Sequence, residues 1–490
     1  MDEPPIRTFW WLKRLLPVAV ALPVAWLGFH IWLGNHIDAR EAALLDEWRQ
    51  DGWPHPDETV VNQGVVPQDP RNAAFPLNTA ASALPPLSPE DEDWEADELR
   101  GSPFRVDADG LTHLRSIVET TQLQLDLARQ AREIEEPIFD WGLPAVQIST
   151  LMPLLNSFRE IANRLGYLAA VEHAEGDLLG ATEAIRDMLR LSDATPTYGP
   201  SLVSGLVSCG IEALAAARAA DLATTPIPGL DDADRHERWR AARPAVEALI
   251  ADLLADANEP MHDAAFAYRG ERTMSAAAPQ FVGLPAGGVS GWVAKPFFKA
   301  DLLRTAAFIS AMGDAAAESN DLRGWIDLIA RSRDDFGFEV EPESSAEMLS
   351  ELMSSILLPS LDRGTEAFTR VEAQRRMAAV ALSVRLYRVD HDGALPSDLD
   401  ALVPEYLPFV PGDPMASESP PLRYRLGGPL PVVYSVGVNG QDDGGRMVRP
   451  GGNPQRSWEH LDLAQPLTPA PDPRAEPDEF VIEMESQESP

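Results

Sequence analysis

The longest apolar stretch of the chain lies close to its start. Residues 15–37 contain no Asp, Glu, Lys or Arg, and Leu15–Leu33 is apolar almost throughout. A helix rises 1.5 Å per residue, so about 20 apolar residues cross the hydrocarbon layer of a bilayer. Tryptophans lie near both ends of this stretch, as in the aromatic belts of membrane helices: Trp10, Trp11, Trp26 and Trp32. We therefore predict that residues 1–37 form a short tip and a single transmembrane anchor.

A cleaved signal peptide is the alternative interpretation of this segment. Such a peptide has an apolar run of only about 7–15 residues, followed by a cleavage site of small residues. The run here is longer, and GNHIDAR, which follows it, contains no A-x-A pattern. The sequence favours the anchor over the signal peptide.

Charge predicts the orientation of the anchor and the side on which the rest of the chain lies. Arg7, Lys13 and Arg14 precede the apolar run closely, whereas Arg40 and Arg49 follow it at a greater distance. Basic flanks stay in the cytoplasm, so we expect the N-terminus there and the bulk of the chain in the periplasm, anchored in the cytoplasmic (inner) membrane. The 490 residues carry a formal net charge of −37. So acidic a chain is not expected to bind nucleic acid.

Beyond the anchor, the pattern predicts a mainly α-helical protein. Apolar positions recur at helical spacing from Leu111 onward, and we expect an alanine-rich helical-hairpin domain over residues 107–360. Further helices are expected at about 153–174, 177–192, 201–222, 235–258, 299–332 and 344–358. Gly176 and Asp177 predict a tight turn and a helix cap between two antiparallel helices. A single tetratricopeptide-type hairpin is the alternative interpretation of that pair.

Three segments lack a clear helical pattern. Residues 38–106 are rich in proline and acid and are expected to form a connector, helical only at 38–50 and otherwise extended. Residues 273–294 are uncharged, but glycine and proline interrupt them, which predicts a long loop rather than a second membrane span. The acidic, proline-rich tail at 448–490 is expected to be disordered.

The strongest pattern lies in residues 363–447, where we predict a small α+β module. One long helix carries an apolar stripe from Phe368 to Val389 and ends at Gly393 and Pro396. Two short β-branched or alternating runs follow, at 423–426 and 432–436. Gly427 and Gly428 separate these runs, so they are expected to form an antiparallel hairpin against the helix.

This module resembles the globular head of type II secretion pseudopilins, above all the major pseudopilin. The matching positions are Leu386-Tyr387-Arg388, Gly393 to Pro396, Leu399 to Leu402, Gly412-Asp413-Pro414, Tyr424, Tyr434-Ser435-Val436-Gly437 and Asn439-Gly440. The resemblance covers less than a fifth of the chain. The apolar span lacks the glutamate that pseudopilins carry near its start and lies about 330 residues upstream of the pilin-like helix. We therefore do not expect the chain to polymerise as a pilin.

The layout as a whole is also similar to membrane-anchored planctomycete proteins that pair an alanine-rich helical domain with such a module. That similarity implies no activity.

In pseudopilins the last loop of the head commonly holds a calcium ion. Here Asn439, Asp442 and Asp443 offer side-chain oxygens in the corresponding loop, and oxygen is the ligand that calcium prefers. Calcium at these three residues is therefore the one metal prediction. The alternative is a polar turn in which Asn439-Gly440 adopts positive φ.

No pattern of a known catalytic class stands out in the sequence. The nine histidines are scattered, and no H-E-x-x-H or G-x-S-x-G sequence occurs. Ser204, Gly205 and Cys209 lie among small and apolar residues, which is typical of close helix packing rather than of a nucleophile.

The sequence thus favours a non-catalytic, membrane-anchored envelope interaction or scaffold protein without a cofactor. Its expected partners are the membrane and envelope or secretion proteins, and the head suggests a link to a secretion or pilus-like assembly. The alternative is an envelope hydrolase with an unfamiliar carboxylate site in the helical domain.

Overall fold

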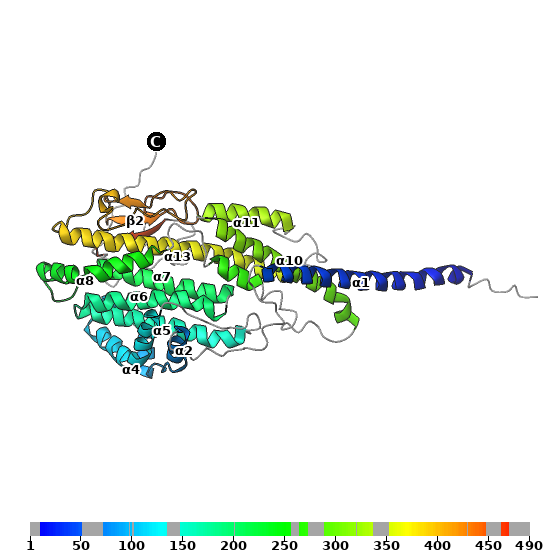
Figure 1. Ribbon diagram of the computed structural model, residues 1–490, viewed down its shortest axis with the longest axis horizontal. Helices are drawn as coiled ribbons and strands as arrows, with labels where there is room; N and C mark the ends of the chain where they lie inside the picture. Colours follow the sequence, from blue (N-terminus) through cyan, green and yellow to red (C-terminus); the bar gives the residue numbers. More distant parts are fainter. Residues whose placement is uncertain are drawn as a thin grey trace, which may run out of the picture.

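The fold is mainly helical, with one small antiparallel sheet, as predicted (Figure 1). A computed structural model describes residues 10–50, 72–97, 99, 102–134, 148–199, 201–255, 264–272, 289–319, 321–336, 352–428, 430–446 and 462–469. The elements are α1 Trp10–Gln50, α2 Ala74–Ser82, α3 Pro89–Asp97, η2 Pro103–Arg105, α4 Ala108–Arg132, α5 Ile148–Ala174, α6 Leu178–Ala194, η3 Thr195–Tyr198, α7 Leu202–Thr224, α8 Asp232–Leu253, α10 Val289–Glu318, α11 Leu322–Phe336, α13 Leu352–Asp390, η4 Asp400–Leu402, β1 Arg423–Arg425, β2 Val432–Ser435 and β3 Leu463–Pro466.

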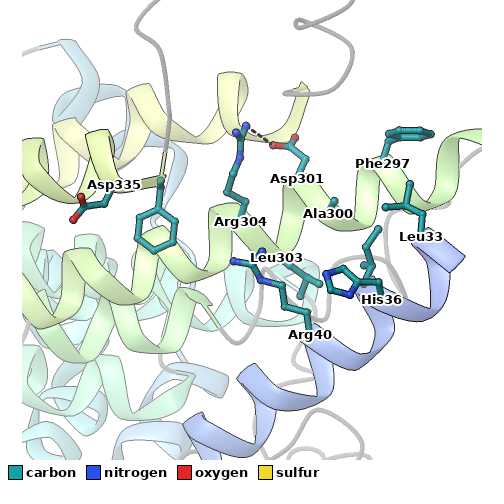
Figure 2. Close-up of a pocket in the computed structure, with 11 residues that line it drawn as sticks. Leu33, His36, Arg40, Phe297, Ala300, Asp301, Leu303, Arg304 and Asp335 are labelled. Atoms are coloured by element: carbon teal, nitrogen blue, oxygen red, sulfur yellow. Dashed lines mark ion pairs between the residues drawn. The ribbon is translucent and has the colours of Figure 1, made fainter. Parts of the chain in front are cut away.

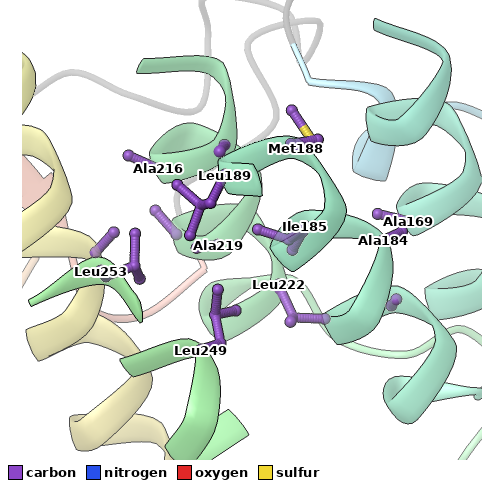
Figure 3. Close-up of a cluster of buried hydrophobic side chains, with 14 of the residues drawn as sticks. Ala169, Ala184, Ile185, Met188, Leu189, Ala216, Ala219, Leu222, Leu249 and Leu253 are labelled. Atoms are coloured by element: carbon purple, nitrogen blue, oxygen red, sulfur yellow. The ribbon is translucent and has the colours of Figure 1, made fainter. Parts of the chain in front are cut away.

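Helices α4 to α8 form a stack whose interior is rich in alanine and leucine (Figure 3). The predicted turn between α5 and α6 is confirmed, because Gly176 has φ +80° and the Asp177 side chain accepts a hydrogen bond from Gly180 N at 2.9 Å. Small side chains such as Ala184 and Ala219 are completely buried, so the helices approach one another closely.

Helix α13 is the shared support of the stack and the sheet. It packs on α7 and α8 along one side and on β2 and β3 along another. The predicted hairpin is confirmed, with Tyr424 of β1 opposite Val433 of β2. Leu422 and Val433 of the hairpin region belong to the same buried cluster as the apolar residues of the helical stack. The predicted domain boundary at 360–363 therefore lies inside one long helix.

Part of the predicted tail is folded. Strand β3 pairs with β2, with Val433 opposite Gln465, and Leu467 just beyond it is 3% exposed. The prediction of a disordered tail is therefore wrong for residues 462–469, and the rest of 448–490 lies outside the described residues. The sheet needs this distant segment because a two-stranded hairpin alone is marginally stable.

The expected helix at 38–50 is confirmed, since these residues continue α1. The prediction that the rest of the connector is extended is wrong in part, because α2, α3 and η2 are folded onto the helical stack through buried side chains that include Leu77, Trp94 and Phe104. Residues 51–71 of the connector lie outside the described residues. Of the predicted loop at 273–294, residues 289–294 form the first turns of α10, and 273–288 lie outside the described part of the chain.

Within the described residues, α7 is the one helix that is long and apolar enough to cross a membrane, and 56% of its apolar window is buried within the protein. The N-terminal span therefore stays a prediction. The small residues of α7 allow neighbouring segments to pack closely against it. A β-carbon at Gly205 would lie only 2.6 Å from the β-carbon of Ala267 and 3.0 Å from the Phe368 ring. As predicted, Gly205 lies at a close helix contact; α7 is a core helix here.

Two glycines of α7 should respond oppositely to alanine. Gly205→Ala is expected to destabilise the protein by about 1–3 kcal/mol, because the added methyl overpacks the contact with Ala267. Gly210 is exposed and a β-carbon there would meet no atom within 4 Å, so Gly210→Ala should stabilise α7 by about 0.5–1 kcal/mol. Thermal unfolding of both variants measures the difference. Equal effects would contradict the close contact at Gly205.

Candidate functional site

A large cavity lies where α1 meets α10 and α11 (Figure 2). It has a volume of about 550 Å³. Leu33 and Ile37 of α1 and Leu303 of α10 contribute to its apolar wall. Leu33 is the last residue of the predicted span, so the cavity begins where that span ends. Two aromatic rings, Phe297 and Phe336, complete the apolar lining.

Charged groups of both signs line the same cavity. His36 and Arg40 point toward it from α1, and Arg304 of α10 lies 3.6 Å from the buried carboxylate of Asp301 (Figure 2). Asp335 of α11 adds a second, exposed carboxylate. An apolar wall with balanced charges suits an amphiphilic molecule. The residues that line this cavity come from three helices far apart in the sequence, so no local pattern predicted it.

Ion pairs hold the C-terminal part of α1 against α10. The ammonium of Lys299 lies 2.5 Å from Asp38 and 2.6 Å from Glu41. Burial opposes protonation of Lys299, but these two carboxylates outweigh it and raise its pKa. Leu45 and Trp48 pack on Ala306 one to two turns farther along. The contact therefore combines an apolar cluster with charge pairing and fixes the direction in which α1 leaves the body.

A second, polar cavity of about 360 Å³ lies between α6, α7, α8 and α13. Two of the carboxylates that line it, Glu212 and Asp252, are paired with arginines. Glu212 accepts a hydrogen bond from Ser192 Oγ at 2.9 Å and lies 3.4 Å from Arg375. Asp252 accepts from Arg186 Nε at 2.6 Å. Arginine pairing favours the ionised carboxylate, whereas a general acid needs the protonated form.

The three predicted calcium ligands lie together, but each is engaged by the protein. Asn439 Nδ2 donates to Asp443 Oδ2 at 3.2 Å. Asp442 accepts hydrogen bonds from Tyr434 Oη at 3.2 Å and from Arg423 Nε at 3.0 Å. Gly440 has φ +69°, as the polar-turn alternative predicts at that position.

Asp462 is a further carboxylate at this loop that the sequence did not reveal. It precedes β3, is 6% exposed and accepts a hydrogen bond from Gly445 N at 2.7 Å. Burial raises its pKa, and the charges of Asp442 and Asp443 raise it further. Within the described residues no group of three or more His, Cys, Asp or Glu side chains is arranged to hold a metal ion. Calcium binding therefore stays a prediction, in which the ion would have to displace Arg423 from Asp442.

No protein-family model matches the chain, and no curated protein or solved structure is detectably similar to it. The pseudopilin resemblance therefore rests on the sequence motifs alone.

Proposed function

We propose that this protein is a membrane-anchored, non-catalytic scaffold whose helical body and pseudopilin-like head lie on the periplasmic side of the inner membrane. The proposal rests on the surface of α1. That helix projects from the body (Figure 1). The side chains of residues 21–29 are all exposed. Its large exposed apolar side chains are Leu22, Val24, Trp26, Leu27, Phe29, Ile31 and Trp32, with exposed fractions of 43–65%.

An apolar surface on all sides of a projecting helix is unfavourable in water. The transfer of apolar surface out of water contributes about 25 cal/mol per Å², and a helix that is apolar all round is buried in a protein core or in a bilayer. The body covers α7, which is comparably apolar, but leaves this part of α1 uncovered. A lipid environment is the simplest way to remove this surface from water.

The scaffold role is supported by how the body and the head are joined. Arg243 of α8 pairs with Asp390 at the end of α13, and Tyr406 of the head donates to the same carboxylate at 3.0 Å. On the other side, Leu322 N of α11 donates to Pro414 O at 2.7 Å. A head held from two sides presents a fixed surface to an envelope or secretion partner. The hydrolase alternative would need two facing carboxylates free of arginine, whereas Glu212 and Asp252 in the polar cavity are each paired with an arginine.

A charge in the middle of the span tests the anchor. Val24→Asp places a carboxylate at the centre of Leu15–Leu33, where insertion costs about 2.5–3.5 kcal/mol. We expect the share of full-length protein that resists alkaline extraction from membranes to fall. Leu123→Asp is the matched control, because Leu123 is 64% exposed on α4, away from α1.

Equal extraction of the two variants would overturn the anchor. Protease added to spheroplasts tests the orientation separately, since protection of the head from external protease would place it in the cytoplasm.

A further inference from the structure

The first turns of α10 lie beside the apolar part of α1. The Trp292 ring lies against His30 with centroids 3.9 Å apart and planes tilted by 31°, and it meets Trp26 edge-on at 5.9 Å. Trp26 and His30 both fall inside the apolar run Leu15–Leu33. A segment about 260 residues farther along the chain thus reaches the predicted span.

Successive contacts show that the two helices run in the same direction. After Trp292 meets His30, Lys299 meets Asp38, and Ala306 then meets Trp48. Higher residue numbers on α10 therefore match higher numbers on α1. The beginning of α10 is its part farthest from the body along α1.

The depth of this contact follows from helix geometry. Trp26 is seven residues before Leu33 and His30 is three, so they lie about 10 Å and about 5 Å inside the end of the span. Half of the hydrocarbon layer is about 15 Å thick. If α1 spans the membrane, Trp292 is therefore at the depth of the outer acyl chains and the interface, where tryptophan is enriched.

The composition of these turns suits that depth. Trp292 is 44% and Phe297 is 45% exposed, so both rings present apolar surface outward. Residues 289–300 contain no acid, and the first acid of α10 is the buried Asp301. Lys295 is exposed, and a lysine near a membrane surface extends its ammonium to the headgroups.

We propose that the first turns of α10, residues 289–297, insert into the leaflet around the outer end of α1 and form a second attachment to lipid. This inference rests on the proposed anchor. Two attachments restrict rotation of the body about α1, which one helix would allow. The 550 Å³ cavity, which runs from Leu33 to Arg40 on α1, then opens at the level of the lipid headgroups.

Lipid-borne quenchers test this placement. In the full-length chain, Cys209→Ala removes the sole cysteine, and single cysteines are then introduced and labelled with a polarity-sensitive fluorophore. Trp292→Cys and Phe297→Cys report on α10, Leu27→Cys reports on α1 at similar depth, and Leu179→Cys, a site 54% exposed on α6, reports on the body. The labelled proteins are reconstituted into phosphatidylcholine vesicles that contain nitroxide-labelled phosphatidylcholine.

We expect the labels at 27, 292 and 297 to lose fluorescence to the nitroxide lipid and the label at 179 to respond only to aqueous iodide. Quenching at 27 without quenching at 292 and 297 would overturn this proposal and leave the anchor intact. Protection of 292 and 297 from both quenchers would also overturn it, in favour of a protein contact. Absence of lipid quenching at 27 would overturn the anchor and this proposal together.

Discussion

Replacing Asp187 by alanine is expected to lower the free energy of unfolding by about 3–5 kcal/mol, the cost of breaking a buried ion pair. The Asp187 side chain is fully buried, and its two oxygens accept from Arg129 Nε at 3.0 Å and Arg132 Nε at 2.6 Å. Burial raises the pKa of this carboxyl, and the two arginines oppose that shift. Without the carboxylate, Glu183 is the acidic partner that Arg132 keeps among the described residues. The contact between α4 and α6 therefore loses its main polar connection.

The matched control is the pair between Arg115 and Glu175, which joins α4 to the end of α5 at 3.0 Å but is 43% and 49% exposed. Glu175→Ala should change stability by less than about 1 kcal/mol, because water screens exposed pairs. Denaturant midpoints of the full chain in detergent provide the comparison. If Asp187→Ala lowered the stability no more than Glu175→Ala does, burial of the Asp187 ion pair would not explain its contribution to stability.

Local pattern was sufficient to predict the helices of the stack. The apolar spacing after Leu111 and the Gly176-Asp177 turn are signals contained within a few residues, and both features are present as predicted. The expected break near 360 is absent, since α13 runs from Leu352 to Asp390. Packing against α7 and α8 holds that helix continuous, and such tertiary contacts are not visible in local spacing.

The sheet and the cavities show why the rest could not be predicted. Strand β3 has only four residues, and Leu463 is followed by Ala, Gln and Pro, which is a poor strand signal. It forms because β2 offers an unpaired edge. Asp462 directly precedes β3, so it could not be assigned to the loop of Asp442 before the pairing of β3 with β2 was known. The contact of Lys299 with Asp38 joins residues 261 apart, a pairing that no local motif encodes.

Replacing Trp325 by alanine is expected to cost about 3–5 kcal/mol, comparable to Asp187→Ala but for a different reason. Trp325 is completely buried in a second core cluster formed by α7, residues 264–272, α10, α11 and α13. Its indole N–H donates to Met312 O at 3.2 Å, and its ring meets Tyr268 edge-on at 5.9 Å. Alanine would leave a cavity and remove the hydrogen bond to Met312 O, which α10 also uses within its own helix. Trp325→Phe keeps an aromatic ring and should lose only about 1–3 kcal/mol, from the smaller ring and the lost hydrogen bond.

The loss at Trp325 should also reach the head. Helix α11 begins at Leu322, whose N–H donates to Pro414 O at 2.7 Å, so loosening α11 removes one of the two sides that hold the head. Hydrogen exchange at residues 412–418 is therefore expected to rise in Trp325→Ala. Trp32→Ala, which truncates a ring 58% exposed on α1, should leave both exchange and body stability unchanged. Unchanged exchange in Trp325→Ala, despite a large loss of stability, would show that α13 alone positions the head.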